Sequence, residues 1–379
     1  MNPDYHLEND LGKRLPSVSS WFSSQSHVQK GSEEGGSMQR NSTKRASLAS
    51  IAAEAGVSVS TVSRIVNGQL DRANRETVER VQALIESSGY RPNSVGQALR
   101  KRESRVVAML APNLDNPAMG AIATSTEAAL RAAGYVMILC DTHDEPDLQD
   151  EYLDAMRAQF VQGYVLVSTV ASPGLAAFLA RGEPAVLVGR RQPGTLQPGH
   201  PQAPFVGIDN AAAGADAADF LLESGIAEPA LLHAKLTSTA VADRVAGFLN
   251  RLAERGVEPA LVRRATASSL QHLELGYQAA KALVADGGWP KGLLCVSDLM
   301  AYGAYRLASE TGVAIPQDCL IVGVDDSPLN RWIAPWLSSV HIPYESFGAA
   351  IVGQLQALWG GDTPADRLLP HQLVNRLKA

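Results

Sequence analysis

The chain has 379 residues, the composition of an ordinary globular protein, and a formal net charge of −6 at pH 7. No run of about 18 apolar residues occurs, which excludes a membrane-spanning helix, and the first residues lack the basic-then-apolar order of a secretory signal. A chain this long predicts two or three domains and a substantial core.

Charge is distributed unevenly along the chain. Residues 39–105 contain 12 Lys and Arg against 6 Asp and Glu, a net charge of +6, whereas residues 106–379 carry −10. A small basic module joined to an acidic body is typical of a protein with a polyanionic partner. Solvated surface charge alone gives the same pattern.

The three cysteines, Cys140, Cys295 and Cys319, are odd in number, and each lies in or beside an apolar run. We expect them to be small buried core residues rather than disulfide partners or metal ligands. This use of cysteine indicates a cytoplasmic location.

Residues 1–38 are rich in Ser, Gly, Asn and Gln and show no apolar periodicity. We expect either a disordered extension or a translation start at Met38, which lies just before the first orderly segment. In the second case the upstream residues do not exist in the native protein.

Three short helices are expected next, within residues 39–91. Apolar residues recur at helical spacing in each segment, and Ser, Asn and Gly stand where helices are capped or end. A glycine-containing turn joins the first two, which is typical of a helix-turn-helix. The predicted helices lie between Ser47 and Gly56, from Ser58 through Ile65 in the stretch GVSVSTVSRIVNG, and from Asn74 to Gly89.

From residue 104 onward, apolar runs of five to eight residues alternate with amphipathic segments, as in VVAMLAP, YVMILCD and GYVLVST. Runs of Val, Ile and Leu that alternate with helices predict parallel sheets covered on both faces. About 275 residues exceed one compact sheet, so we expect two lobes. The lobes are expected at about residues 104–204 and 205–325, with crossovers near 204, 326 and 339.

The chain resembles transcriptional regulators of the LacI/GalR family from about Ser47 to its C-terminus. The resemblance rests on an ordered set of motifs: AxxAGVSxSTVSRxxNG, GYRPN, DN, RxxGF, SDxMAxGA and VGxDDSP. It implies an N-terminal three-helix helix-turn-helix headpiece at residues 39–91 and a hinge helix or linker at 92–103. It also implies a two-lobed α/β core at 104–379, similar to periplasmic sugar-binding proteins, that binds an effector and dimerises.

The resemblance indicates which residues meet DNA. Val59 and Ser60 match positions that contact base edges in relatives, and Arg64 matches a base-contacting arginine; the alternative for Arg64 is an ion pair within the headpiece. Short hydroxyl side chains nearby suit close approach to phosphates or cap the helix, whereas Val57, Val62 and Ile65 are expected in the core. The predicted DNA-contacting residues are Ser58, Val59, Ser60, Thr61, Ser63, Arg64, Asn67, Asn93 and Leu99.

The hinge has Val95 and Leu99 at i, i+4 spacing, followed by three basic residues. The resemblance implies that this segment becomes helical on DNA and that Leu99 wedges into the minor groove. Gly96 stands where relatives usually carry alanine, and glycine costs about 1 kcal/mol inside a helix. We therefore expect a hinge that is readily disordered without DNA; the alternative is a solvated linker.

Ligands of open parallel sheets bind outside the carboxyl ends of the strands. Asn113, Asp141 and Arg190 follow predicted strands of the first lobe, while Arg244 in DRVAGF and Asp298 in VSDLMAYGA match the family's effector-binding arginine and aspartate. A guanidinium facing a carboxylate suits vicinal hydroxyls. These residues predict a small-molecule effector, a carbohydrate or related metabolite, and no metal or cofactor.

Other residues near these motifs have simpler interpretations. Asp209 is expected to cap the following helix, and Asp325 and Asp326 to belong to the crossover structure rather than to contact the ligand. Trp332 and Trp336 fit either a subunit contact or the core. The segments NPAM and SSLQHLELG lack the aromatic residues that several relatives place there, so we expect an atypical effector.

These features predict a sequence-specific DNA-binding regulator, a repressor that binds a palindromic operator as a homodimer in the cytoplasm, associated with the bacterial nucleoid and with no membrane partner. No P-loop, HExxH, GxSxG or dinucleotide fingerprint occurs, which weighs against an enzyme with catalytic residues. The headpiece weighs against a solute receptor for a transporter. Activation in place of repression, and a corepressor in place of an inducer, are also compatible with the sequence.

Overall fold

The computed structural model of the chain describes residues 47–66, 68–70, 73–90, 104–191, 203–236, 238–269 and 271–377. The chain divides into two compact units, residues 1–103 and 104–379. The expectations for residues 1–38, for Asn67 and for the hinge with Asn93 and Leu99 concern residues outside the described ranges.

The described residues of the first unit form three helices that begin and end at the capping residues of the sequence. The Ser47 hydroxyl accepts a hydrogen bond from the Ser50 amide, and Gly56 ends the helix in a left-handed conformation that glycine adopts easily. Asn74 caps the third helix and Gly89 ends it. The predicted helices are therefore confirmed. They are α2 (Leu48–Ala55), α3 (Val59–Val66) and α4 (Arg75–Ser88).

An apolar cluster holds the three helices together. Helix α3 contributes Val62 and Ile65, which are buried as the sequence predicted, and Val57 packs against them from the turn. Because these residues recur at helical spacing, they occupy one face of α3 and leave its other face to solvent. The buried residues of α2 and α4 in this cluster are Ile51, Ala52, Ala55, Val78 and Val81.

Six strands form the first sheet of the second unit, in the order β11-β5-β4-β3-β1-β2, and every pair in it is parallel. The strands are β1 (Val106–Ala111), β2 (Val136–Asp141), β3 (Gly163–Val167), β4 (Ala185–Val188), β5 (Phe205–Gly207) and β11 (Arg367–Leu368).

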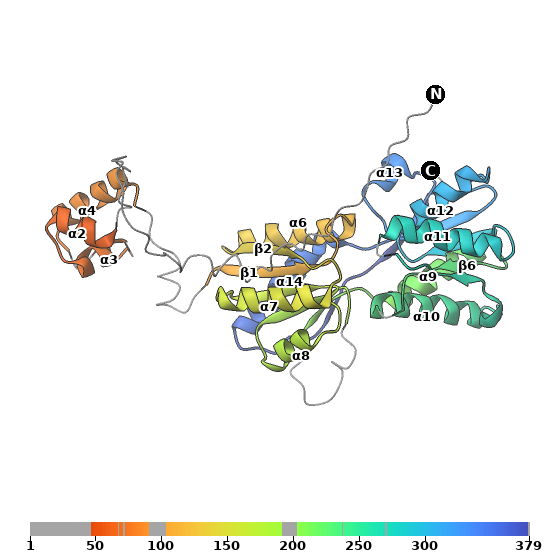
Figure 1. Cartoon of the computed structure of the whole chain (residues 1–379), viewed down its shortest axis with the longest axis horizontal. Helices are drawn as coiled ribbons and strands as arrows, with labels where there is room; N and C mark the ends of the chain where they lie inside the picture. Colours follow the sequence, from red (N-terminus) through yellow and green to blue (C-terminus); the bar gives the residue numbers. More distant parts are fainter. Residues whose placement is uncertain are drawn as a thin grey trace, which may run out of the picture. The chain divides into compact units, whose positions relative to one another are not determined.

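Side chains of these strands alternate between two apolar layers. Val107 and Met109 of β1 pack in the apolar cluster that contains two helices on one face of the sheet. Ala108 and Leu110 pack in the cluster that contains two helices on the other face. Cys140 lies in the second layer; like Cys295 and Cys319 it is buried with a free thiol, as predicted. Figure 1 shows the first sheet between its helices. The pairs are α6 (Pro117–Ala132) with α14 (Tyr344–Trp359), and α7 (Pro146–Ala158) with α8 (Pro173–Ala180).

The second sheet has the order β12-β10-β9-β8-β6-β7, with only β12 antiparallel to its neighbour. Its strands are β6 (Ala230–Leu232), β7 (Arg264–Ala265), β8 (Gly292–Cys295), β9 (Leu320–Asp325), β10 (Ser338–His341) and β12 (Gln372–Val374). The helices of this lobe are α9 (Asn210–Glu223), α10 (Thr239–Glu254), α11 (His272–Ala285), α12 (Asp298–Glu310), the short α13 (Asn330–Ile333) and the 3₁₀ turn η2 (Pro259–Leu261).

The chain crosses between the two lobes after β5, β10 and β11, that is, after residues 207, 341 and 368. The crossovers expected near 204 and 339 are thus displaced by a few residues, and the one expected near 326 is wrong. Strand β10 lies beside β9, with Ser338 opposite Val322. The sequence does not predict β10 as a strand because two of its buried residues are serines, which interrupt the apolar run. Strand β11 has only two residues and is too short to show a pattern.

Helices α6 and α14 pack with their backbones in contact. A Cβ atom on Gly348 of α14 would overlap the carbonyl group of Ser125 in α6, and the Ser125 hydroxyl donates a hydrogen bond to the Tyr344 carbonyl at 2.8 Å. Only glycine allows this approach. The contact fixes the start of α14, which directly follows the second crossing.

Replacing Gly348 with Ala is expected to lower the free energy of unfolding by about 1–3 kcal/mol, because the two helices must separate to admit a methyl group. Gly353→Ala in the same helix is the matched control. Its methyl group meets open space, so alanine's helix propensity predicts a gain of up to about 1 kcal/mol. Denaturant unfolding followed by circular dichroism measures both variants, and equal midpoints would contradict the close packing.

Candidate functional site

Helix α3 presents short side chains on its exposed face. The Ser58 hydroxyl accepts a hydrogen bond from the Thr61 amide at 3.1 Å and lies 2.7 Å from the Ser60 hydroxyl. Val59 is 48% exposed, and Arg64, a little more than one turn further, is also exposed. Because the opposite face is buried in the headpiece core, these residues form the solvent-facing side of α3, and short side chains there suit close approach to a groove.

The structure brings six of the nine predicted DNA-contacting residues together on α3 and its cap. The exposure pattern suits approach to a polyanion, and contact with DNA stays a prediction. Ser58, Val59, Ser60 and Arg64 are exposed, whereas Thr61 and Ser63 are half-buried. Asn67, Asn93 and Leu99 lie outside the described residues.

A cavity of about 390 Å³ lies in the second unit, in the range of small-molecule sites. Residues beyond the carboxyl ends of strands from both sheets line it, as expected for open parallel sheets. Apolar side chains such as Met119, Ile122 and Leu275 fill the wall between polar ones. The polar lining residues are Asn116, Asp144, Ser168 and Arg190 from the first lobe, and Asn210, Lys235, Ser238, Arg244, Ser268, Ser269, His272, Ser297 and Asp325 from the second.

Arg244, one of the predicted effector residues, lines this cavity from α10. Its Nε donates a hydrogen bond to the Asn210 side-chain oxygen at 2.7 Å, and its Nη1 donates one to the Val296 carbonyl at 2.8 Å. Two bonds to different elements fix the plane of the guanidinium. Arg244 is therefore held at the wall of the cavity before any ligand binds.

Arg190, a second predicted effector residue, lines the cavity from the first lobe. Its Nη1 donates a hydrogen bond to the Thr169 carbonyl at 3.3 Å and lies 3.9 Å from Asp144 Oδ1. Burial lowers the pKa of Arg190, and the charge of Asp144 counteracts this. The guanidinium remains a cation, since its ordinary pKa lies far above neutrality.

Asn113 and Asp141, also predicted as effector residues, do not line the cavity. The Asp141 carboxylate accepts hydrogen bonds from the Asn113 amide at 2.9 Å, the Leu114 amide at 3.1 Å and the His143 amide at 3.0 Å. Burial raises the pKa of Asp141, but these amides and the charge of His143 outweigh it and lower the pKa overall. Asp141 thus shapes the loops around the cavity.

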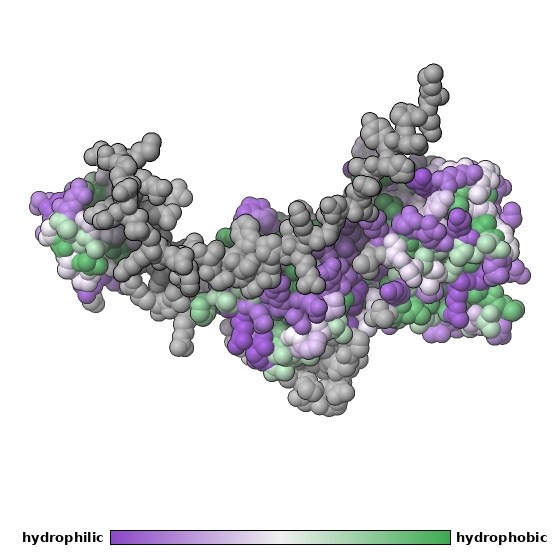
Figure 2. Space-filling model, in the orientation of Figure 1, coloured by the Kyte–Doolittle hydropathy of each residue, from purple (hydrophilic) through white to green (hydrophobic). Residues whose placement is uncertain are grey.

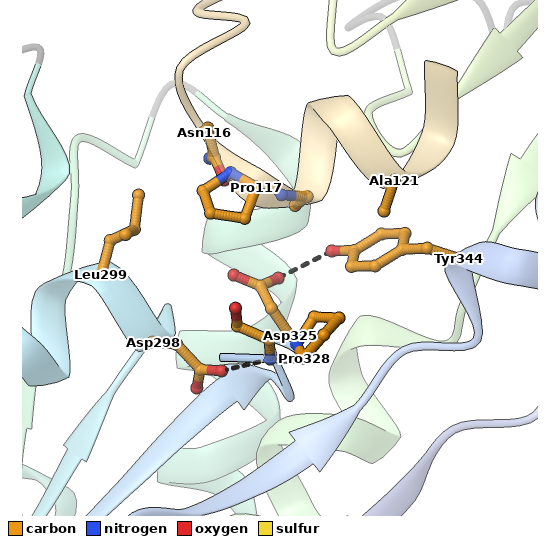
Figure 3. A pocket seen from close by; sticks show the side chains of 10 residues that line it. Asn116, Pro117, Ala121, Asp298, Leu299, Asp325, Pro328 and Tyr344 are labelled. Atoms are coloured by element: carbon orange, nitrogen blue, oxygen red, sulfur yellow. Dashed lines mark hydrogen bonds between the residues drawn. The ribbon is translucent and has the colours of Figure 1, made fainter. Parts of the chain in front are cut away.

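Asp298, the fifth predicted effector residue, is 1% exposed and lines a separate small cavity of about 20 Å³. Its Oδ2 accepts hydrogen bonds from the Ser327 amide at 2.7 Å and the Asn330 side chain at 2.8 Å, and its Oδ1 lies 2.6 Å from the Ser339 hydroxyl. Figure 3 shows Asp298 below Asp325, on the side of that residue away from the start of α6. Asp298 and Arg244 line different cavities, and their pairing around one ligand stays a prediction.

Asp325, which the sequence assigned to crossover structure, lines both cavities. Its Oδ1 accepts a hydrogen bond from the Tyr344 hydroxyl at 2.7 Å (Figure 3). Burial raises the pKa of Asp325, while the charges of Arg244 and His272 oppose the rise. No motif identified Tyr344 or His272, because each reaches Asp325 only through the fold.

Aromatic side chains line the larger cavity from a part of the chain that the sequence analysis did not single out. Tyr344 and Phe347 come from the first turn of α14, with ring centroids 5.4 Å apart. Among the described residues that line the cavity, none of the aromatics comes from the segment after the first strand or from the second lobe. The C-terminal helix supplies them because it returns to the first lobe after the second crossing.

The simpler interpretations of Asp209 and Asp326 are confirmed. The Asp209 side chain accepts a hydrogen bond from the Ala212 amide and caps α9. Asp326 accepts one from Arg376 at 2.6 Å and lies 3.2 Å from His341, both in the crossover region. Trp336 is half-buried and stacks on Tyr305, so it belongs to the packing of its lobe.

The part of the chain that the structure describes holds no group of three or more His, Cys, Asp or Glu side chains placed for a metal ion. In the same ranges, no helix is both long and apolar enough to cross a bilayer. On the face that Figure 2 shows, hydrophilic residues are spread over both lobes, with smaller hydrophobic areas between them.

Two family models match the chain. "Bacterial regulatory proteins, lacI family" matches residues 47–93, and "Periplasmic binding protein-like domain" matches residues 218–377. The HTH-type transcriptional regulator MalR of Streptomyces coelicolor is 34% identical over 337 residues, 86% of this chain and 92% of that protein. The HTH-type transcriptional repressor PurR of Erwinia tasmaniensis is 29% identical over 315 residues, 82% of this chain and 89% of that protein.

Solved structures share the fold. The Lac repressor dimer bound to operator and the anti-inducer ONPF matches with a TM-score of 0.76 at 24% identity, over 88% of this chain and 98% of that one. The transcriptional regulator CelR–cellobiose complex matches with a TM-score of 0.63 at 28% identity, over 87% of this chain and 99% of that one. Both similarities extend over the headpiece and the two-lobed core.

The network around Asp298 predicts how stability depends on pH. Burial and the charge of Asp325 raise the pKa of Asp298 to about 7, against 3.8 for an ordinary aspartate. The folded core therefore binds a proton that the unfolded chain has already lost. Stability is lost as pH rises from about 4 to 7, because ionisation of the buried group is disfavoured.

Asp298→Asn removes this titration, and its amide can donate to the Ser339 hydroxyl while its oxygen keeps the other two bonds. We expect the thermal midpoint of the variant, relative to the native chain, to rise between pH 5 and 7 and to level off above pH 7. Asp209→Asn, at the exposed cap of α9, is the control because asparagine caps equally well. A difference that stays flat with pH for Asp298→Asn would contradict the raised pKa.

Proposed function

Since the chain belongs to the LacI family of bacterial regulatory proteins, we propose that it is a repressor that binds a palindromic operator as a homodimer under the control of a small hydroxylated effector. Membership confirms the resemblance and the fold predicted from the sequence, and makes the chain a DNA-binding transcriptional regulator. The observation that carries the proposal is that one chain combines a helix-turn-helix with a two-lobed core around a polar cavity.

The exposed face of α3 supports DNA recognition. Arg64 offers two donors in a plane, which suits the O6 and N7 edge of guanine, and Val59 offers methyl groups, which suit the methyl group of thymine. The short hydroxyls beside them leave room for the phosphate walls of the groove. Outside the described residues, we propose that Asn93 and Leu99 of the hinge add minor-groove contacts.

The cavity supports control by a small molecule. Its polar groups come from both lobes, so a ligand inside it contacts both at once. Such a ligand changes operator affinity only if it binds one arrangement of the chain better than another. The bound cellobiose named for the similar CelR complex favours a carbohydrate.

An exposed apolar patch on the second lobe supports a homodimer. Trp332 and Ile333 of α13 are 73% and 63% exposed, with Leu329 and Tyr305 also exposed nearby. A patch of this kind is typical of an interaction surface. One headpiece contacts a half-site, so two copies related by a two-fold axis match a palindrome.

The proposal is tested by mixing the purified chain with fragmented genomic DNA and sequencing what it retains, first alone and then with a panel of sugars. We expect retained fragments to share a palindromic sequence and one sugar to change the amount retained. Retention without any shared sequence would overturn the proposal.

Arg64→Ala is expected to weaken binding to the selected operator by roughly 10- to 100-fold, which corresponds to about 1–3 kcal/mol of base discrimination. Arg75→Ala is the matched control, because it removes the same charge from the exposed start of α4, where Arg75 pairs with Glu79. Fluorescence anisotropy with operator and with scrambled DNA measures both. Equal losses for the two variants would show that Arg64 acts only through its charge.

Trp332→Glu is expected to convert the dimer to a monomer, because a charge would be buried in the apolar contact. The change is measured by sedimentation equilibrium, where the 40.2 kDa chain is easily told from its dimer. Leu261→Glu, at a residue 78% exposed on η2, is the control. A Trp332→Glu variant that sediments as a dimer would place the interface elsewhere.

A further inference from the structure

Two guanidinium groups in the wall of the larger cavity keep a hydrogen-bond donor unused. Arg244 donates through Nε and Nη1 to the Asn210 side chain and the Val296 carbonyl, and its Nη2 makes no hydrogen bond to a described residue. Arg190 donates through Nη1 to the Thr169 carbonyl, and its Nη2 is unused in the same way. Neither Nη2 is among the buried side-chain atoms that lack a partner. Both nitrogens therefore keep surface that a ligand in the cavity can reach.

Asn210 adds a third donor of this kind. The residue is 7% exposed and lines the cavity. Its side-chain oxygen accepts the hydrogen bond from Arg244 Nε at 2.7 Å, and this fixes which side of the amide carries the nitrogen. That nitrogen makes no hydrogen bond to a described residue and is not one of the buried atoms without a partner. A nearly buried side chain thus offers its free N–H groups to the cavity.

The start of helix α10 adds backbone donors. Ser238 precedes the helix without a side-chain capping bond, and the first turn contains no acidic residue. Amides that begin a helix have no partner within it and lie at the positive end of its dipole. Ser238, Ala240 and Val241 line the cavity here, and so does Lys235, which directly precedes this turn in the chain. The donors of this segment therefore face the same space as Arg244.

The two carboxyl groups of the wall offer few free acceptors in return. Asp325 Oδ1 accepts a hydrogen bond from the Tyr344 hydroxyl at 2.7 Å, and burial raises the pKa of this carboxyl, which disfavours its charged form. Asp144 Oδ1 is a buried atom that a ligand in the cavity cannot reach. Asp144 Oδ2 accepts from the Asn113 side-chain amide at 3.4 Å. Acceptors in the wall are thus mostly used or hidden.

The charge of the wall has the same bias. Burial lowers the pKa of His272, so this side chain is neutral at pH 7. A hydroxyl group needs an acceptor as well as a donor, whereas an oxyanion only accepts. A wall rich in free donors therefore favours a phosphate or carboxylate, whose hydrogen bonds to charged donors are also the stronger ones. Among the described lining residues, the cations outnumber the carboxyl groups: Arg190, Lys235 and Arg244 against Asp144 and Asp325.

We propose that the effector is an anionic polyhydroxylated molecule, a sugar phosphate or a sugar acid, whose oxyanion lies in the second lobe between Arg244, Asn210 and the start of α10. This inference rests on the proposed function of the cavity and names the chemical class of its ligand. Neutral polar side chains elsewhere in the wall, such as Ser168 and Ser268, suit the hydroxyl groups of the same molecule. Asn210, which no sequence motif indicated, becomes a specificity-determining residue.

The first test measures binding to the full chain by isothermal titration calorimetry. The probes are matched neutral and anionic compounds: glucose with gluconate, glucuronate and glucose 6-phosphate, galactose with galacturonate, ribose with ribose 5-phosphate, and the neutral disaccharides maltose and cellobiose. We expect an anionic member to bind at least about 10-fold more tightly than its neutral counterpart, and the acid and phosphate members to show which oxyanion fits. Tightest binding by a neutral sugar overturns the proposal, as does a panel in which no anionic compound binds.

The second test uses the anionic probe of highest affinity and the variant Asn210→Asp. The new carboxylate still accepts from Arg244 Nε but replaces the free N–H groups with a negative charge. Binding of the anionic probe is expected to weaken roughly 10- to 100-fold, whereas its neutral counterpart should lose little. Asn210 is the first residue of α9, where an acidic side chain is favoured by the helix dipole, so the fold is expected to be kept. Equal losses for the two probes would show a purely structural role and reject the site.

Controls separate this effect from misfolding and from remote charge. Asn250→Asp makes the same substitution at an exposed position near the end of α10, outside the cavity, and should leave binding unchanged. Thermal unfolding of both variants checks the fold. If Asn210→Asp does not fold, the native chain is titrated between about 0.05 and 0.5 M salt, where affinity for the anionic probe should fall and affinity for the neutral one should not. Equal salt dependence of the two would reject the oxyanion contact.

Failure of this inference is distinguishable from failure of the proposed function. The same protein preparation is assayed for retention of palindromic genomic fragments without any added ligand. Selective retention together with preference for neutral probes would reject the anionic effector and leave DNA recognition intact.

Discussion

Parallel strands bring their carboxyl ends to one edge of a sheet, and this constraint determines where the chain can hold a small molecule. In the first lobe the loops after β2 and β4 carry Asp144 and Arg190, and in the second lobe β9 ends at Asp325. All three residues line one cavity. A molecule bound there touches both lobes, so its binding energy depends on how the lobes are arranged.

Buried carboxyl groups secure the crossing between the lobes. Asp298 takes hydrogen bonds from Ser327, Asn330 and Ser339, and Asp325 takes one from Tyr344. Satisfying these groups fixes the loop after β9 against the start of α12 and against α14. This arrangement leaves two neighbouring carboxyl groups buried, and burial disfavours the ionisation of both. These hydrogen bonds therefore hold in place the wall of the cavity that the second lobe forms.

Local signals in the sequence predicted the headpiece almost completely, because capping by Ser47, Asn74 and Gly56 depends on neighbouring residues alone. The alternation of apolar runs and helices likewise predicted two parallel sheets. The cavity was predicted only in part. Arg190 and Arg244 follow from strand ends and motifs, whereas the remaining polar groups depend on contacts between segments far apart in the chain. The Tyr344 hydroxyl, for example, reaches a carboxyl group 19 residues away across a lobe crossing.

Helix α14 extends from the cavity to the amino ends of strands β2 and β3 in the first sheet. It begins at Tyr344, beside Asp325, and ends at Trp359, which stacks on Tyr135 at 4.6 Å and donates to the Gln162 carbonyl at 2.9 Å. Its 16 residues span about 24 Å at 1.5 Å per residue. A tilt of about 5° at its first turn would displace its last turn by about 2 Å. Tyr135 directly precedes β2, whose first amide bonds the carbonyl of Arg105. A displacement of α14 at the cavity is therefore transmitted along the helix to its last turn, which packs beside the residues where the chain enters the core.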